Sequence, residues 1–257
     1  VSSNPEPNRN VLEVQGISKT FGGLQAVSEA SLQVVQGSIV SLIGPNGAGK
    51  TTLFAIISGF LKADSGMVLL SGELLNGLKP FQICEKGMVR TFQITQPFAR
   101  LSILENIMIG SYAKIADPIE AAKKAEAVAA RVGIRMPLES PAADLNVAGR
   151  KRLELARALA TQPKILLLDE VMAGLNPVEV EEILKIIRNI RDSGVTIFLI
   201  EHVMQAVMSL SEFTYVLNNG QLIASGTPQQ VAADPQVIEA YLGQGASHLK
   251  KDQKTDA

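Results

Sequence analysis

The chain has 257 residues, of which 46% are hydrophobic and 19% charged, as is typical of a globular protein of one or two domains. Its formal net charge of −1 gives no excess of positive charge for nucleic acid or an anionic membrane surface, so we expect no nucleic-acid partner. The single cysteine, Cys84, excludes an internal disulfide, and we expect it to be an inert core residue in a reducing compartment.

The N-terminal part of the chain is predicted to be a polar tail followed by short strands. Residues 1–10 are polar and contain two prolines, so we expect a flexible tail and no signal peptide. Patterns of β type predict strands at residues 11–14, 30–34, 38–43 and 67–70. The apolar runs at 165–168 and 195–200 are far shorter than the ~20 residues that span a bilayer, which indicates a cytosolic protein.

A glycine-rich loop follows the strand predicted at 38–43 and precedes an apolar helix. Glycine, four residues, Gly-Lys and Thr form the P-loop pattern in the strand–loop–helix context that it requires. Glycines let successive N–H groups turn inward around a phosphate, and the helix N-terminus adds the positive end of its dipole. Lys50 is predicted to reach the β- and γ-phosphates of a nucleoside triphosphate, and Thr51 to ligate Mg²⁺. The predicted nucleotide-binding residues of the loop are Gly44, Pro45, Asn46, Gly47, Ala48, Gly49, Lys50, Thr51 and Thr52.

The second half of the chain is predicted to be helical first and then to alternate strands with helices. Helices are expected at residues 121–132 and 153–160 within a helical stretch at about 101–162. Further elements are a strand at 164–168, an amphipathic helix at 178–191, a strand at 195–200, a helix from 202, and a hairpin around Asn218-Asn219-Gly220. This is an α/β core with a helical insertion, followed by a lysine-rich tail from about residue 244.

Two carboxylates, Asp169 and Glu170, follow the buried strand predicted at 164–168. In a P-loop protein the aspartate at the end of a second buried strand supplies a Mg²⁺ ligand, directly or through water. Glu170 lies one residue further on, where it could polarise the attacking water as a general base. The alternative is a pair of acidic residues that only caps the strand end.

These motifs, with Gln93, the stretch Leu145-Asn146-Val147-Ala148-Gly149 and His202, occur in the order found in the ATP-binding-cassette ATPases. The chain resembles that family over about residues 11–243, between tails at 1–10 and 244–257. The resemblance implies an α/β P-loop NTPase fold, with a mixed core sheet, an antiparallel β-subdomain and a helical subdomain inserted at about 95–162.

The resemblance also implies roles for three isolated residues. Phe21 matches the aromatic residue that stacks on adenine, although a lone Phe near a strand end is otherwise a core residue. Gln93 matches the residue that ligates Mg²⁺, senses the γ-phosphate and contacts the membrane partner. His202 matches the residue that contacts the γ-phosphate, where a surface histidine would be the ordinary interpretation.

The signature stretch departs from the Leu-Ser-Gly-Gly-Gln that is usual in the family. Asn146 replaces the serine and keeps an amide that can donate to phosphate. Val147 and Ala148 replace two glycines, so a role that needs positive φ is lost, while the helix N-terminus remains. The resemblance implies that Asn146, Val147, Ala148 and Gly149 contact the ATP of an opposing subunit.

Within the family the chain looks most like the ATPase subunits of branched-chain (hydrophobic) amino-acid importers, notably at residues 148–154, 169–177 and 200–204. This likeness implies a dimer with a second ATPase subunit, identical or different, and two ATP molecules in the interface. It also implies two transmembrane permeases, an extracytoplasmic binding protein, and a position on the cytoplasmic face of the membrane.

Three alternatives remain open from the sequence. The first is an ABC ATPase for another cargo, such as lipopolysaccharide export, and the second is a soluble ABC ATPase without a transport role. A P-loop GTPase is disfavoured because no guanine-reading Asn-Lys-x-Asp stretch occurs in the chain.

Overall fold

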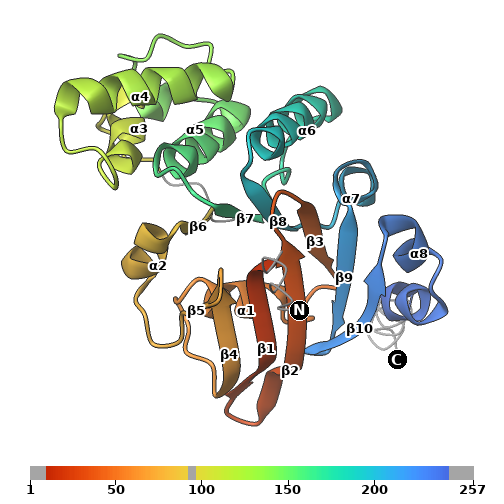
Figure 1. Ribbon diagram of the computed structural model, residues 1–257. Helices are drawn as coiled ribbons and strands as arrows, with labels where there is room; N and C mark the ends of the chain where they lie inside the picture. Colours follow the sequence, from red (N-terminus) through yellow and green to blue (C-terminus); the bar gives the residue numbers. More distant parts are fainter. Residues whose placement is uncertain (1–9, 92–96, 243–257) are drawn as a thin grey trace, which may run out of the picture. The chain divides into compact units, whose positions relative to one another are not determined.

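The computed structural model describes residues 10–91 and 97–242; Gln93, the predicted tail at 244–257 and all but the last residue of the predicted tail at 1–10 fall outside these ranges, and Asn10 belongs to a strand rather than to a tail. The chain divides into two compact units, the first from residues 1–34, 39–76 and 200–257 and the second from residues 35–38 and 77–199. Within residues 10–91 and 97–242, no helix combines the length and the hydropathy needed to cross a lipid bilayer. Figure 1 labels the helices and strands of both units.

The first unit contains an antiparallel sheet with the strand order β2-β1-β4-β5. Its strands are β1 (Asn10–Phe21), β2 (Leu24–Val35), β4 (Ser65–Leu70) and β5 (Glu73–Leu74). β1 pairs with β4 so that Leu12 lies opposite Leu70, and the register shifts between Gln15 and Ser18. β1 is longer than the predicted strand because it continues through this irregularity, where Gly16 has a φ of +58°.

The first unit also contains three strands that pair with one another and the helices that cover them. β3 (Ile39–Ile43) runs parallel to β9 (Phe213–Asn218), which pairs antiparallel with β10 (Gln221–Gly226). The helices are α1 (Lys50–Ile57), α7 (Met204–Leu210) and α8 (Pro228–Ala232), and residues 235–242 are also helical. Ile43, Val207, Val216, Val231 and Val237 pack together as a buried apolar cluster.

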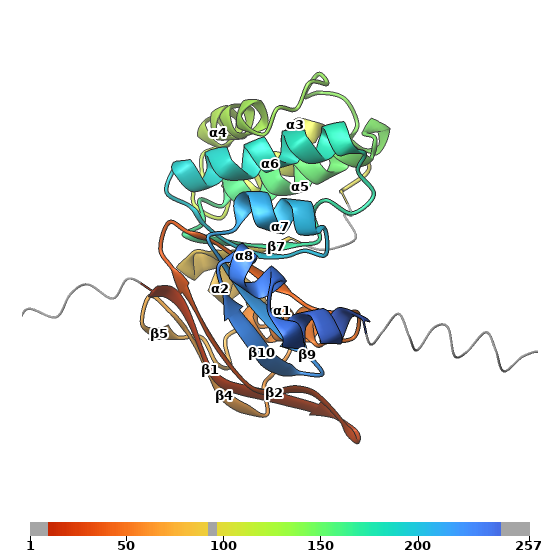
Figure 2. The same cartoon turned by 90° about the vertical axis from the view of Figure 1, so that its right-hand side faces the viewer.

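The second unit combines short parallel strands with the longest helices of the described chain. β6 (Met88–Arg90) runs parallel to β7 (Ile165–Asp169), and β7 is followed in the strand order by β8 (Thr196–Ile200). The helices are α2 (Pro80–Lys86), α3 (Ile103–Ser111), α4 (Pro118–Arg131), α5 (Val147–Ala160) and α6 (Pro177–Asp192), with a 3₁₀ turn at Ala142–Asp144. Helices α3, α4 and α5 lie side by side in both Figure 1 and Figure 2.

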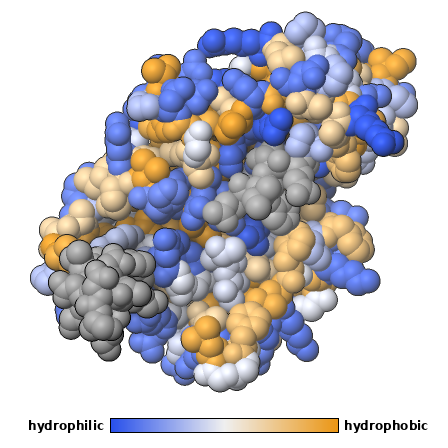
Figure 3. Space-filling view, turned by 180° about the vertical axis from the view of Figure 1, so that it is seen from behind, coloured by the Kyte–Doolittle hydropathy of each residue, from blue (hydrophilic) through white to orange (hydrophobic). Residues whose placement is uncertain are grey.

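Parallel and antiparallel strand pairs occur together with helices, so the predicted α/β class is confirmed. The amphipathic helix predicted at 178–191 is α6, whose isoleucines 183, 186, 187 and 190 are all buried. The helix predicted from residue 202 begins instead at Met204, so that His202 lies in the loop before it. On the face shown in Figure 3, hydrophobic and hydrophilic residues alternate in small groups.

Candidate functional site

The loop between β3 and α1 has a backbone that only glycine can adopt at two positions. Gly44 has a φ of +153°, and an added Cβ would lie 2.0 Å from the carbonyl oxygen of Leu217. Gly49 has a φ of +102°, and its Cβ would lie 2.3 Å from the carbonyl oxygen of Ala26. Both side chains are excluded by backbone atoms, which cannot move aside as a flexible side chain can. The glycines of the P-loop pattern are therefore required by the fold itself.

Lys50, the first residue of α1, lies back over the loop. Its Nζ donates to the carbonyl oxygens of Gly44 at 2.7 Å and of Pro45 at 2.9 Å, and the residue is only 7% exposed. No side chain caps the N-terminus of α1, and its first turn contains no acidic residue. A buried ammonium and an uncapped helix N-terminus both favour an anion at this position.

Tyr241 contacts the same loop and carries no motif that would have indicated it. Burial raises the pKa of the Tyr241 hydroxyl, and a hydrogen bond with the backbone of Gly44 opposes this effect without cancelling it. The residue lies in the helical segment 235–242, almost 200 residues after the P-loop. Tyr241 is one of three tyrosines in the chain, and its neighbours in the sequence do not point to the P-loop.

Phe21 is the last residue of β1, and its ring is 47% exposed, so the alternative of a core residue is wrong. The Nζ of Lys19 lies 5.5 Å from the centre of the Phe21 ring and 2.6 Å from Asp64 Oδ1. Asp64 also accepts from the backbone N–H of Thr20 at 2.7 Å. The Lys19 ammonium and this N–H hold the pKa of Asp64 below its usual range. The strand end is thus held in place while the ring stays accessible.

Asp169 ends β7 and is only 2% exposed. Its Oδ2 accepts from Nη2 of Arg90 at 2.7 Å, and its backbone N–H donates to Oγ1 of Thr91 at 3.2 Å. Thr91 in turn donates its N–H to the carbonyl oxygen of Leu167 at 2.9 Å. No motif in the sequence includes Arg90. The available signal was an arginine in a short apolar run that becomes the parallel neighbour of β7.

Glu170 follows Asp169 and has a φ of +48°. Left-handed backbone costs a non-glycine residue about 1–2 kcal/mol, and such strain is found preferentially at functional sites. The carbonyl oxygen of Glu170 accepts from the N–H of Ala173 at 3.2 Å, which turns the chain away from the strand direction. The carboxylate therefore sits on a tight turn at the carboxyl end of a parallel strand, where ligands collect in α/β sheets.

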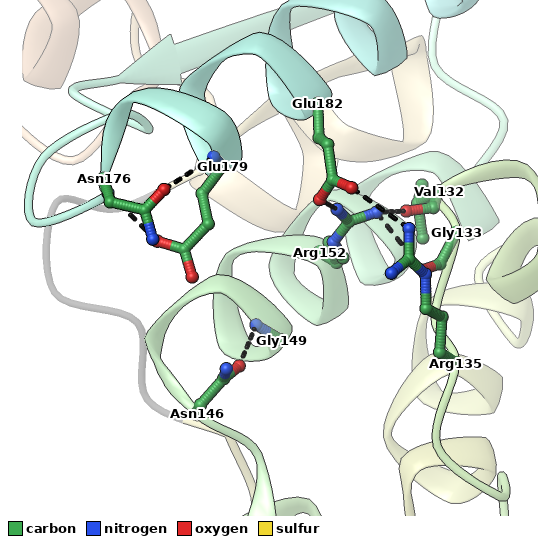
Figure 4. A network of polar contacts seen from close by, with 9 residues as sticks. All are labelled: Val132, Gly133, Arg135, Asn146, Gly149, Arg152, Asn176, Glu179 and Glu182. Carbon is green, nitrogen blue, oxygen red and sulfur yellow. Dashed lines mark hydrogen bonds and ion pairs between the residues drawn. The ribbon is translucent and has the colours of Figure 1, made fainter.

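The signature stretch forms the start of α5 and is drawn in Figure 4. Asn146 is the N-cap, and its Oδ1 accepts from the N–H of Gly149 at 2.8 Å. A Cβ on Gly149 would lie 2.8 Å from Leu145 Cδ2 and 3.1 Å from that Oδ1, which gives a packing reason for the glycine. Val147 is 52% exposed, whereas Ala148 is 8% exposed. Neither has a positive φ, as expected from the loss of the two family glycines.

The predicted site residues fall into two groups. Phe21, the P-loop and His202 belong to the first unit, and His202 is exposed just after β8. Asp169, Glu170 and the start of α5 belong to the second unit. Within residues 10–91 and 97–242, no three His, Cys, Asp or Glu side chains form a group that could hold a metal ion. Cys84 lies in α2, is only partly buried rather than in the core, and has its pKa raised by that burial.

Comparisons with known proteins define the class. The family described as "ABC transporter" matches residues 27–173, which is more than half of the chain. The chain therefore belongs to the ABC transporter family and is an ATP-binding ATPase of that family. A second family, described as "Branched-chain amino acid ATP-binding cassette transporter", matches residues 221–247.

Individual relatives cover nearly the whole chain. The high-affinity branched-chain amino acid transport ATP-binding protein LivG of Escherichia coli K12 is 40% identical, over 91% of this chain and 98% of LivG. The corresponding BraF of Pseudomonas aeruginosa is 38% identical, over 92% and 99% of the two chains. The ADP conformation of an ATP-binding cassette of an ABC transporter has a TM-score of 0.83 at 32% identity, covering 91% of this chain and 99% of that one.

Proposed function

We propose that this chain is the ATP-hydrolysing subunit of an importer of branched-chain or other hydrophobic amino acids. The assignment of the transported substrate rests on 40% identity to LivG over 98% of its length. The branched-chain amino acid family match at residues 221–247 supports it. The lipopolysaccharide export ATP-binding protein LptB of Haemophilus influenzae is 34% identical, which makes lipopolysaccharide export the second candidate. A membrane-peripheral location on the cytoplasmic face follows from the first proposal.

The P-loop supplies the phosphate site in this proposal. Backbone N–H groups of the loop and of the uncapped start of α1 bind the phosphates. Lys50 then donates to phosphate oxygens in place of the carbonyl oxygens of Gly44 and Pro45. The exposed ring of Phe21 stacks on the adenine. No reorganisation of the glycines is needed, because the fold already imposes their conformation.

Mg²⁺ fits the oxygen donors that the motifs supply, since it is usually held by one or two protein groups together with substrate phosphates. The hydroxyl of Thr51 and the carboxylate of Asp169 are the proposed ligands, with the side-chain oxygen of Gln93 as a third. When bound, the ion neutralises charge on the β- and γ-phosphates. Arg90 holds Oδ2 of Asp169 in a buried ion pair.

Glu170 is the proposed general base, and His202 the proposed contact to the γ-phosphate. The Glu170 carboxylate accepts a hydrogen bond from the attacking water and takes a proton from that water as the γ-phosphoryl group is transferred. The exposure of His202 in the loop before α7 supports this role.

The start of α5 is proposed to act on the nucleotide of a second ATPase subunit, identical or different. The P-loop covers one side of a triphosphate, and the positive end of the α5 dipole offers an anion site for the other side, with the N–H of Gly149 already bound to Asn146 Oδ1. ATP binding then closes the dimer, and loss of the γ-phosphate opens it. Two permeases would convert this closure into transport, and an extracytoplasmic binding protein would deliver the amino acid.

Reconstitution tests the cargo. The chain is assembled in proteoliposomes with the permeases, partner ATPase and binding protein encoded beside it, and the uptake of radiolabelled leucine is measured. ATP-dependent uptake that unlabelled valine or isoleucine competes away supports the proposal. ATPase activity stimulated by lipopolysaccharide but not by the loaded binding protein would assign the chain to export instead.

A further inference from the structure

Three arginines of the second unit, Arg131, Arg135 and Arg152, contact helix α6 or the residue that follows it, at two separate places. Arg152 of α5 and Arg135 both reach Glu182 of α6 (Figure 4). Arg131, at the end of α4, reaches the far end of α6 by donating to the carbonyl oxygens of Asn189 at 3.3 Å and Ile190 at 3.4 Å, and to Ser193. The first place is a cluster of ion pairs at the sixth residue of α6, and the second is a set of hydrogen bonds to the C-terminal end of that helix.

Arg152 is the more deeply placed member of the Glu182 cluster. Its Nη1 donates to the carbonyl oxygens of Val132 at 3.0 Å and Gly133 at 3.2 Å, while its Nη2 binds Glu182 Oε2. The Arg152 side chain is 11% exposed, against 83% for Arg135. Since exposed ion pairs contribute little, Arg152 dominates the cluster. Gly133 makes room for it, because a Cβ there would lie 2.7 Å from Arg152 Nη1.

The Arg152–Glu182 pair lies at matching positions on its two helices. α5 begins at Val147 and α6 at Pro177, so each partner is the sixth residue of its helix. A cavity of about 440 Å³ is lined from the α5 side by Asn146, Ala148 and Gly149 and from the α6 side by Glu179 and Glu182. The ion pair of Arg152 with Glu182 is therefore a direct polar contact between α5 and α6 at the lining of this cavity.

The loop that leads from Glu170 into α6 also approaches the start of α5. A Cβ placed on Gly174 would lie 3.9 Å from Val147 Cγ1. The capping box of Asn176 and Glu179 then fixes how α6 starts, with hydrogen bonds of 3.0 Å in both directions. The signature residues and the loop after Glu170 thus meet within one unit.

We propose that Arg152 is a positioning residue that, with Glu182, fixes the start of α5 relative to the start of α6. The signature turn and the Glu170–Asn176 loop are thereby presented to an opposing subunit as one rigid element. The contact of this element with ATP bound by the opposing subunit rests on the proposed function above. The coupling between the starts of α5 and α6 does not depend on that function.

Amide hydrogen exchange of the nucleotide-free protein tests the coupling by itself. Arg152→Met and Glu182→Gln should each raise exchange about tenfold in peptides covering both 149–156 and 179–186. Arg131→Met is the control, because it removes an arginine that hydrogen-bonds the C-terminal end of α6 and leaves Glu182 untouched. It should raise exchange near 186–193 only. Unchanged exchange at 149–156 in Arg152→Met, or equal effects there in Arg131→Met, would overturn the proposal.

ATP-driven dimerisation tests the consequence for the opposing subunit. In the Glu170→Gln background with saturating MgATP, Arg152→Met or Glu182→Gln should raise the protein concentration for half-maximal dimerisation about tenfold. The double variant should lose no more than either single variant, as expected for one coupled pair. The dissociation constant for MgADP should change less than twofold. Dimerisation equal to the parent would refute the positioning role, whereas a parent that never dimerises refutes the proposed function and leaves the exchange experiment to decide the coupling.

Discussion

The carboxylate of Asp169 is paired with the guanidinium of Arg90 inside the protein, with 2.7 Å between Oδ2 and Nη2 and side chains only 3% and 7% exposed. The two residues come from neighbouring parallel strands, β7 and β6, and are 79 positions apart in the sequence. The proposed Mg²⁺ ligand therefore has one of its oxygens fixed by the protein.

Arg90→Met should destabilise the fold by about 3–5 kcal/mol, because it leaves the buried Asp169 carboxylate without its charged partner. The free energy of unfolding from urea titration measures the effect. The double variant Arg90→Met/Asp169→Asn should recover much of the loss, since the uncompensated charge is gone. Lys123→Met, which breaks the exposed pair with Glu120, is the control and should change stability by less than about 1 kcal/mol.

Lys50→Ala should weaken ATP binding at least tenfold, because the ammonium directed at the loop carbonyls is the charge proposed to meet the phosphates. Isothermal titration with MgATP measures the dissociation constant. Adenosine, which lacks phosphates, is the control ligand. An ATP dissociation constant equal to that of the wild type refutes the role of Lys50.

Glu170→Gln should retain ATP binding and reduce steady-state hydrolysis by at least about 100-fold, because the amide cannot accept the proton of the attacking water. Phosphate release and size-exclusion chromatography with ATP are the measurements, and an ATP-bound dimer should accumulate. If hydrolysis continues at the wild-type rate, Glu170 is not the general base.

Glu170→Gly should be as inactive as Glu170→Gln but more stable than it by several tenths to about 1 kcal/mol, since glycine adopts a φ of +48° without strain. The greater freedom of glycine in the unfolded chain reduces the gain. Thermal unfolding of the two variants side by side measures the difference. A lower melting temperature for the glycine variant would show that the backbone at this turn is not strained.

Asp64→Asn should lower stability at neutral pH but not under strongly acidic conditions. The pKa of Asp64 is lowered in the folded protein, first by Lys19 and then by the N–H of Thr20, so its contribution is present above the unfolded value. That contribution disappears as the pH falls through the folded-state pKa, which lies below 3.8. The free energies of unfolding of wild type and variant, measured at a series of pH values, should converge as the pH falls. NMR titration of the Asp64 carboxyl checks the direction of its pKa shift.

The P-loop, the Asp169 strand end and α6 were predictable because each depends on local spacing of residues. The isoleucines of α6 recur with the helical period, and the P-loop glycines occur at the fixed spacing of a known motif. Arg90 and Tyr241 were missed because their importance comes from partners 79 and almost 200 residues away. Helix α2 was missed because its bracketing signals, Pro80 at the start and Gly87 after the end, enclose only seven residues.

The contacts of Gly44 and Gly49 imply that the phosphate cradle is set when the chain folds and not when nucleotide arrives. The atoms that exclude a Cβ at these glycines are the carbonyl oxygens of Leu217 in β9 and Ala26 in β2. The loop therefore already has the backbone conformation of the phosphate site, and little loss of conformational entropy opposes nucleotide binding. Mutations in β2 or β9, far from the phosphates, should change the conformation of the loop and thereby the affinity for both ATP and ADP.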